Sequence, residues 1–134
     1  MMDKHLEKML NFALQAQQLS YSPYSKFKVG ACIYSSNNNY YLGANIENAS
    51  YPLSSCAENS AISAMIMNKD NLIKEILVLG GDNLHLCPPC GGCRQKIREF
   101  SNSKTIIHLA TSKKIEKSIL LTDLLPISFG PENL

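Results

Sequence analysis

The sequence predicts one α/β domain over residues 1–134, a three-layer α/β/α sandwich around a mixed five-stranded sheet. Two observations lead to this fold class. The chain has 134 residues, of which 45% are hydrophobic and 18% charged, and this composition suits one globular core better than a disordered chain. Helical and strand patterns follow one another in the order α-β-β-α-β-α-β-β, which is typical of a sheet that is partly antiparallel and partly parallel.

The elements in the first half of the chain are predicted from hydrophobic spacing and turn residues. From Leu6 the apolar residues recur at helical intervals, so about the first 15 residues are expected to form an amphipathic helix. Residues 27–34 and 40–46 are predicted strands, and the polar turn formers at 35–39 join them as an antiparallel hairpin. The stretch after Ser55 is apolar nearly all round, which predicts a helix buried within the domain.

The second half of the chain begins with a short apolar run at 75–79, which predicts a central strand. A helix is expected to begin near 91–92, because Cys93, Ile97 and Phe100 share one face at helical spacing. The remaining elements are two strands and a short helical turn, predicted at 105–110, 118–121 and 122–126.

The charge of the chain argues against large anionic partners. Thirteen basic and 11 acidic residues leave a net charge of +2, and the basic residues are scattered, so neither nucleic acid nor a membrane surface is an expected partner. No apolar run approaches the roughly 18 residues of a membrane helix. Residues 1–8 lack the apolar segment of a signal peptide. A cytoplasmic location is expected, with the five cysteines present as thiols or metal ligands.

Three cysteines and a glutamate form a candidate catalytic metal site. Cys56 and the pair Cys90 and Cys93 each lie where a helix is predicted to begin, and the positive end of a helix dipole favours thiolates. Three protein ligands with one vacant position are typical of catalytic zinc, whereas structural zinc is usually held by four. Glu58 follows Cys56 by two residues, so it could reach a water molecule on the metal without binding the metal itself.

Each part of this site has an alternative interpretation. Cys90 and Cys93 could be a redox pair, and Cys87 forms a second pair of the same spacing with Cys90. Ser55 and Glu58 have the spacing of a helix capping box, which on spacing alone is the better interpretation of the glutamate. The third cysteine beside Glu58 favours zinc over redox chemistry. It also favours an acid–base role for Glu58, because the site otherwise lacks such a group.

The motifs resemble those of the small, three-cysteine cytidine deaminases that act on free nucleosides. Segments 56–58 and 89–93 match the zinc-deaminase signature, in which a Cys-x-Glu motif precedes Pro-Cys-x-x-Cys. Three further segments, 21–31, 45–51 and 124–131, match the family's N-terminal stretch, its ribose-binding segment and its C-terminus. The resemblance runs in the expected order from about Tyr21 to Leu134. In this family a proline directly precedes the first ligand of the pair, as Pro89 precedes Cys90.

The resemblance implies zinc-dependent hydrolysis of cytidine and 2′-deoxycytidine to the uridines with release of ammonia, a reaction of pyrimidine salvage. One zinc ion per subunit would be held by Cys56, Cys90 and Cys93, and would lower the pKa of a water molecule toward about 7. Glu58 would take a proton from this water. It would then deliver protons to N3 and to the departing amino group.

The resemblance also implies a set of substrate contacts and a homotetramer with shared active sites. Asn45 and Glu47 would hold the ribose hydroxyls, and Ala57 would contact the base through its backbone. The other implied contacts are Phe27 against the nucleoside, Ala49 and Tyr51 lining the site across a subunit boundary, and Phe129 stacked on the pyrimidine of a neighbouring subunit.

One position departs from the family pattern. Asn59 stands where three-cysteine members commonly have an arginine that offsets the thiolate charge, and Arg94 is the first candidate to replace it. Residues outside the motifs are expected to be bystanders to the metal: Cys32, Cys87, His5, His85 and His108.

Three other functions remain open on the sequence. A deaminase of cytosine-containing antibiotic nucleosides would share the zinc chemistry. A nucleic-acid cytosine deaminase would need a basic groove or aromatic platforms, for which a charge of +2 and no tryptophan offer little. A non-catalytic zinc or thiol module would need a fourth protein ligand or a reducible disulfide.

Overall fold

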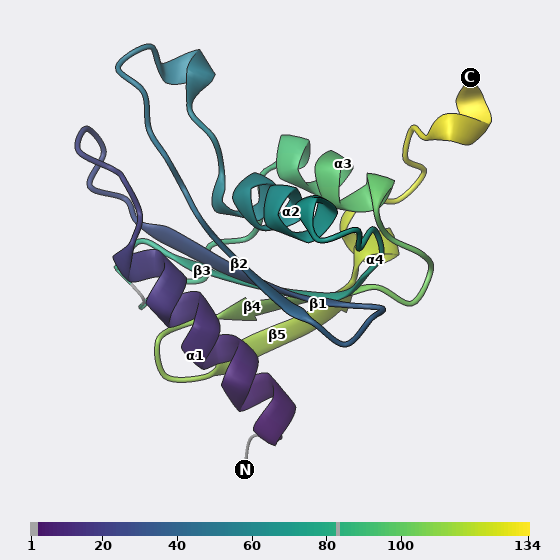
Figure 1. The fold of residues 1–134 in the computed structure, drawn as a ribbon, viewed down its shortest axis with the longest axis horizontal. Helices are drawn as coiled ribbons and strands as arrows, with labels where there is room; N and C mark the ends of the chain where they lie inside the picture. The colour runs from purple at the N-terminus through teal and green to yellow at the C-terminus, as the bar shows by residue number, and fades with distance from the viewer. Residues whose placement is uncertain (1–2, 83) are drawn as a thin grey trace.

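A mixed sheet of five strands forms the middle layer of the computed structural model, which describes residues 3–82 and 84–134 (Figure 1). The strands are β1 (Val29–Ser35), β2 (Tyr40–Ala44), β3 (Ile73–Gly80), β4 (Ile106–Ala110) and β5 (Ile115–Leu120). They lie in the order β2-β1-β3-β4-β5, with β3 and β4 parallel and every other neighbouring pair antiparallel. The predicted mixed five-stranded sheet and its first hairpin are therefore confirmed. The expected domain also includes residues 1, 2 and 83, which lie outside the described residues.

Helices cover both faces of the sheet and complete the predicted three-layer sandwich. The helices are α1 (Lys4–Gln18), α2 (Ala57–Met67), α3 (Gly91–Glu99) and α4 (Leu121–Leu124), with short 3₁₀ helices η1 (Tyr51–Leu53) and η2 (Pro131–Asn133). Figure 1 shows α1 on one face, and α2 and α3 together on the other. Within residues 3–82 and 84–134, none of the helices has both the length and the apolar character needed to cross a bilayer.

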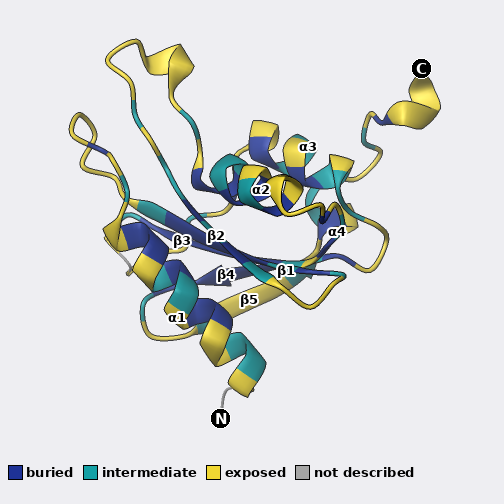
Figure 2. Cartoon of the chain, in the orientation of Figure 1, coloured by how far each residue is buried: buried dark blue, intermediate teal, exposed yellow. Residues whose placement is uncertain are grey.

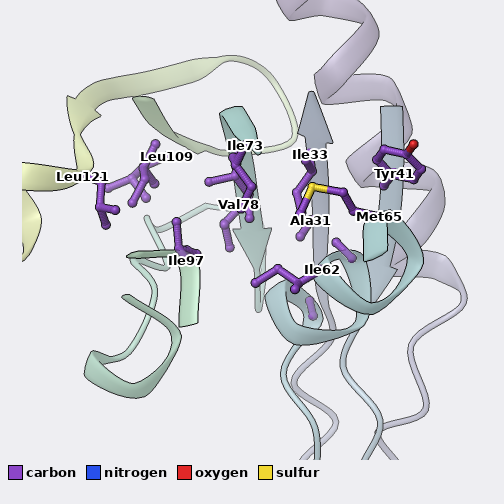
Figure 3. Close-up of a cluster of buried hydrophobic side chains, with 14 residues drawn as sticks. Ala31, Ile33, Tyr41, Ile62, Met65, Ile73, Val78, Ile97, Leu109 and Leu121 are labelled. Carbon is purple, nitrogen blue, oxygen red and sulfur yellow. The ribbon is translucent and has the colours of Figure 1, made fainter. Parts of the chain in front are cut away.

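The core has two parts because successive residues of a strand point to opposite faces of the sheet. Ala31 and Ile33 of β1 pack with α2 and α3, whereas Cys32 between them packs with α1. Figure 3 shows the larger part, in which Ile62 and Met65 of α2 lie against the sheet. Strands β1 and β3 are thus covered on both faces, which accounts for their nearly continuous apolar sequences.

Two sequence-based expectations differ from the structure. The last strand begins at Ile115 rather than Ser118, because the pairing of this edge strand with β4 continues past a register shift to Ile115, which lies opposite Ala110. Helix α2 is not buried all round, since only one of its faces lies on the sheet. Ile66 and Met67, in the last turn of α2, are exposed (Figure 2).

A polar cluster links α1 to the sheet on the face opposite α2. The two oxygens of Glu75 each accept a hydrogen bond, one from His5 and one from His108, both at 2.7 Å. The other ring nitrogens contact Tyr40 and Ser118, at 2.8 and 2.7 Å. Hydrogen bonding to His108, followed by that to His5, holds the pKa of Glu75 below its ordinary value of 4.5. The two histidines therefore have structural partners, as expected for residues outside the metal site.

Replacing Glu75 by glutamine is expected to destabilise the protein in a pH-dependent way. A carboxyl whose pKa is lowered by folding stabilises the fold above its unfolded pKa, and this contribution is lost as the pH falls through the folded value. Glu75→Gln should cost about 1–3 kcal/mol near neutral pH. The difference from wild type should narrow between about pH 5 and about pH 3 in thermal unfolding followed by circular dichroism.

The control for this prediction is Glu116→Gln, which removes an exposed carboxylate 3.9 Å from the Lys114 ammonium. Surface pairs of this kind contribute little to stability, so this variant should match wild type at every pH. A Glu75→Gln deficit that stays constant down to pH 3 would show that the charge of Glu75 does not stabilise the fold.

Candidate metal and active site

Two helix N-termini bring three cysteines together. Cys56 is the N-cap of α2, Cys90 is the N-cap of α3, and Cys93 lies in the first turn of α3. Their sulfur atoms all lie within 4.8 Å of one another. Cys93 is buried on the same helix face as Ile97, as the helical spacing predicts. The structure thus assembles the expected set from two segments 34 positions apart, which is the number separating Cys56 from Cys90.

The three sulfurs fit a zinc ion. With zinc–sulfur bonds of about 2.3 Å, tetrahedral geometry places neighbouring sulfurs about 3.8 Å apart, and small side-chain rotations reach this from the observed spacing. Three thiolates are a donor set that zinc prefers. Cys56 and Cys90 are exposed and line a cavity, so a fourth ligand can enter from the solvent side. This arrangement is that of an open, catalytic type of zinc site.

The local environment acts differently on the three thiols. The pKa of Cys90 is lowered, chiefly because the backbone N–H of Cys93 favours its thiolate. Burial raises the pKa of Cys56 and of Cys93. The N-terminal ends of α2 and α3 both point their positive dipole ends at this cluster, so anionic sulfur is favoured by the backbone of two helices.

Glu58 lies beside the cysteines and is 4% exposed. Burial raises the pKa of its carboxyl, while its own backbone N–H and the Cys93 side chain act in the opposite direction. The capping-box alternative is wrong, because Cys56 rather than Ser55 is the N-cap and Glu58 is the second residue of the helix. The Ser55 hydroxyl instead accepts a hydrogen bond from the Asn59 side chain at 3.2 Å. The Glu58 carboxyl therefore does not serve as a capping group, and it lines the cavity.

The cavity beside the cysteines has a volume of about 440 Å³. Its walls include the metal cluster, Glu58 and five of the expected substrate contacts: Phe27, Asn45, Glu47, Tyr51 and Ala57. The remaining lining residues were not singled out as contacts: Ser25, Val29, Ser54, Ser55, Cys87 and Pro88. Cys87 lies outside the three-cysteine cluster, as expected, but forms part of the cavity wall.

Two expected contacts do not line this cavity. Ala49 lies in the segment between β2 and η1, and Phe129 lies in the C-terminal segment, where it is 58% exposed. Both were expected to act across a subunit boundary. Figure 1 shows that each segment projects away from the sandwich, one before η1 and the other ending in η2. Tyr51, by contrast, contributes to the cavity of its own chain.

Isolated β-bridges hold the segment that carries Asn45 and Glu47 against the start of α2. Ile46 pairs with Tyr21 on one side and with Ser55 on the other. Ser55 directly precedes Cys56, so these bridges tie the segment after β2 to the start of α2. Asn45 and Glu47 flank Ile46 in extended chain, which points both side chains to the same side.

The Asn45 side chain holds the neighbouring loop in place. Its Oδ1 accepts hydrogen bonds from the Ser20 hydroxyl and, at 2.8 Å, from the Val29 backbone N–H. Its Nδ2 donates to the Phe27 carbonyl at 2.8 Å. An amide nitrogen has two hydrogens, so one N–H of Asn45 is left to donate to a ligand.

Glu47 is held in its ionised form by the same loop. Its carboxylate accepts the backbone N–H groups of Tyr24 and Ser25 at 3.0 and 3.1 Å, and also the Ser25 hydroxyl. The Ser25 hydroxyl is the main reason that the pKa of Glu47 is lowered. Ser25 lies in the segment 21–31 that carries the resemblance, but its contact depends on loop closure and could not be found from spacing.

The end of β3 makes room for the Phe27 ring. Gly81 adopts a φ of +69°, and a Cβ at this position would come closer than 3.0 Å to Phe27. The Gly81 backbone N–H also donates to the Lys28 carbonyl at 2.9 Å. A glycine is needed here both for the left-handed backbone and for the close approach of the aromatic ring.

Two basic side chains of α3, Arg94 and Lys96, are candidates to offset the charge of the thiolates. The Arg94 guanidinium donates to the Pro89 and Leu124 carbonyls, at 2.8 and 2.9 Å. Burial raises the pKa of Cys56 and of Glu58, and the positive charge of Lys96, one turn beyond Cys93, acts in the opposite direction on both groups. Lys96 is exposed in the groove between α2 and α3, which Asn59 also lines.

Comparisons with known proteins agree with this geometry. Residues 3–109 match the family described as "Cytidine and deoxycytidylate deaminase zinc-binding region". The chain is 34% identical to a cytidine deaminase of Sporosarcina psychrophila, with 96% of this chain and 94% of that protein covered. It is 35% identical to a cytidine deaminase of Halalkalibacterium halodurans, with 99% and 98% covered.

Solved structures are similar over nearly the whole chain as well. A cytidine deaminase from Burkholderia pseudomallei superposes with a TM-score of 0.85 at 31% identity, covering 96% of this chain and 100% of that one. A cytidine deaminase from Mycobacterium tuberculosis superposes with a TM-score of 0.84 at 31% identity, covering 96% and 99%. The likeness thus includes the segments before and after the zinc-binding region.

Proposed function

Since the chain belongs to the cytidine and deoxycytidylate deaminase family, we propose that the cavity lined by Glu58 and the three cysteines is its active site. The enzyme carries out the zinc-dependent, hydrolytic deamination of cytidine to uridine, with release of ammonia. One observation supports the location above all others. Three sulfurs within 4.8 Å lie beside a buried carboxyl, in a cavity that Asn45 and Glu47 also line.

Proton transfer in this mechanism is the task of Glu58. Zinc bound by Cys56, Cys90 and Cys93 would lower the pKa of a water molecule toward about 7. Glu58 accepts a proton from the attacking water, whose oxygen forms a bond to C4 of the pyrimidine. Its carboxyl passes this proton to N3, then accepts the second proton from the new C4 hydroxyl and donates it to the amino group. The C4–N bond breaks, ammonia leaves, and the C4 carbonyl of uridine remains. Burial suits this exchange, because it raises the pKa of Glu58 toward the range in which a carboxyl can both accept and return a proton.

Asn45 and Glu47 are proposed to recognise the sugar. Asn45 has one N–H left to donate, and the ionised Glu47 can only accept. A hydroxyl group both donates and accepts, so this pair suits two neighbouring hydroxyls of a furanose ring. Phe27 and the Ala57 backbone are proposed to contact the base. We extend the proposed substrates to 2′-deoxycytidine, which keeps the base and most of these contacts.

A homotetramer with shared active sites is the proposed assembly, each chain contributing one domain. Ala49 and Phe129 lie on segments that project from the sandwich, and the exposed side chains there include Tyr51, Leu53 and Ile127. Figure 2 shows η1 and η2, which belong to these segments, in the colour of exposed residues. A neighbouring subunit would cover them. A cytoplasmic location is also proposed, since a reducing compartment keeps the three ligand cysteines as thiols.

Phe129→Ala is expected to weaken cytidine binding without removing zinc. A base stacked on an aromatic ring contributes about 1–3 kcal/mol, so KM should rise by roughly 5- to 150-fold. The shared-site arrangement is tested by mixing Phe129→Ala subunits with Glu58→Gln subunits under exchange conditions. Sites that combine an intact Glu58 with a neighbour's Phe129 should recover the wild-type KM. Failure to recover it, with exchange confirmed by mass spectrometry, would place Phe129 in its own chain's site or in none.

The proposed substrates are tested by an absorbance assay with cytidine and 2′-deoxycytidine, alongside zinc analysis of the same sample. Both nucleosides should be converted by protein that contains about one zinc per chain. A cytosine-containing antibiotic nucleoside and single-stranded DNA serve as competing substrates. Faster turnover of either would assign the cavity to that substrate, and zinc-loaded protein that deaminates none of them would refute the proposed site.

A further inference from the structure

We propose that Arg98 is a positioning residue for substrate binding, because it clamps the C-terminal tail, residues 126–134, to α3 and so fixes the direction in which Phe129 projects. This inference rests on the proposed shared active site, in which Phe129 acts on a neighbouring subunit. Its basis is a set of contacts between α3 and the tail that no part of the deamination chemistry requires.

The Arg98 side chain contacts the tail on both sides of Phe129. Its Nε donates to the Ser128 hydroxyl at 2.7 Å, and its Nη2 donates to the Glu132 carboxylate. The arginine side chain is 23% exposed, which reduces the competition from water for both bonds. A guanidinium is planar and offers several N–H groups in a fixed arrangement, so one arginine can hold two points of the tail at a set distance.

Gly130 makes this clamp possible. A Cβ at this position would come closer than 3.0 Å to three atoms of the Arg98 guanidinium. The backbone of Gly130 is extended, with a φ of −158°, so a larger residue could adopt its conformation. The glycine is therefore required for space and not for its backbone angles. On the same side of the tail, the Gln95 amide donates to the Phe129 carbonyl at 2.9 Å.

The clamped segment presents two exposed apolar side chains. Phe129 is 58% exposed, and Ile127 is fully exposed with a φ of 49°. A β-branched residue rarely adopts this left-handed conformation, and it persists only where surrounding contacts impose it. The bonds from Arg98 and Gln95 supply such contacts just after Ile127.

Helix α3 thereby connects two active sites. Its N-terminal end carries Cys90 as the N-cap and Cys93 in the first turn, and its later residues hold the tail through Gln95 and Arg98. If Phe129 reaches a neighbouring subunit, the same helix positions the zinc ligands of one active site and the Phe129 ring in another. A loosened tail should therefore weaken substrate binding while the chemistry at Glu58 continues.

The experiment compares Arg98→Ala, Arg98→Lys and Gly130→Ala with Phe129→Ala. All three are expected to raise KM for cytidine, Arg98→Ala approaching the roughly 5- to 150-fold effect of Phe129→Ala, with kcat and zinc content near wild type. Hydrogen exchange at 127–134 should become faster. Arg98→Lys keeps the charge beside Glu132 but loses the planar fork, so it should restore only part of the binding.

A double mutant separates the clamp from a general loss of stability. Gly130→Ala should raise KM in the wild-type background but add little in the Arg98→Ala background, because the guanidinium it displaces is already absent. Gly130→Ala lies outside α3, so it tests the clamp even if Arg98→Ala fails to fold. Lys104→Ala, which removes an exposed lysine elsewhere, is the control and should leave KM and exchange unchanged.

Three results would overturn the inference. The first is faster exchange of the tail with an unchanged KM in the Arg98 variants. The second is an additive effect of Gly130→Ala and Arg98→Ala. The third is an unchanged KM in Phe129→Ala, which would leave the clamp nothing to position. The third would also remove Phe129 from the proposed shared site. None of the three would affect the proposed deamination itself, which fails if the wild-type, zinc-loaded protein does not deaminate cytidine.

Discussion

Glu58→Gln is expected to lower kcat/KM for cytidine by about 10²- to 10⁴-fold, the loss typical of a missing general acid–base group. Glutamine has the same size as glutamate and can occupy the same buried position at the second residue of α2. It cannot accept a proton from water or return one to N3 and the amino group. The expected loss should therefore appear mainly in kcat, since the groups proposed to bind the sugar and the base are untouched.

Zinc content and a matched control variant distinguish this loss of proton transfer from damage to the metal site. Glu58 lies outside the three-sulfur cluster, so Glu58→Gln should keep about one zinc per chain. Glu99→Gln, a matched change at an exposed glutamate of α3, should keep wild-type turnover. Near-native turnover in zinc-loaded Glu58→Gln protein would show that another group transfers the protons.

The fold could be predicted where local patterns and tertiary packing agree. The hairpin of β1 and β2 has apolar strands and a turn rich in asparagine, and its antiparallel pairing is confirmed. The start of β5 could not be predicted, because Glu116 and Lys117 interrupt the apolar pattern and only pairing with β4 makes this segment a strand. The exposed end of α2 was missed for a related reason, since composition does not say which side of a helix lies on the sheet.

The metal cluster was accessible from sequence because a short motif fixes most of it. Cys90 and Cys93 lie within one helical turn, and Cys56 and Glu58 lie within another. Whether the N-terminal ends of α2 and α3 meet depends on tertiary packing, which spacing along the sequence does not specify. The resemblance to the zinc-deaminase motifs indicated that they do. The pairing of Ser25 with Glu47, and of Arg98 with Ser128, joins residues 22 and 30 positions apart through loops without a repeating pattern. Such contacts follow only from the folded chain.

Cys56→Ala, Cys90→Ala and Cys93→Ala are each expected to lose zinc and, with it, essentially all deaminase activity. Removing one of three ligands leaves an incomplete site, and the remaining two thiolates cannot hold the metal in tetrahedral geometry. The effect should be seen both in metal analysis of the purified protein and in the cytidine assay. Cys93→Ala should be the most destabilising of the three, because this side chain is buried beside Ile97 in the core.

Two other cysteines provide matched controls, and their positions explain why neither is expected to bind zinc. Cys32 is buried in β1 on the face that packs with α1, where burial raises the pKa of its thiol to about 12. Cys87 lies against β3, since a Cβ at Gly80 would meet its sulfur at 3.3 Å, and it lies outside the three-cysteine cluster. Cys32→Ala and Cys87→Ser should therefore keep zinc and activity. If Cys87→Ser lost its metal while Cys93→Ala retained it, Cys87 and Cys90 would be the ligand pair beside Cys56. Cys93, in the first turn of α3, would then not be a zinc ligand.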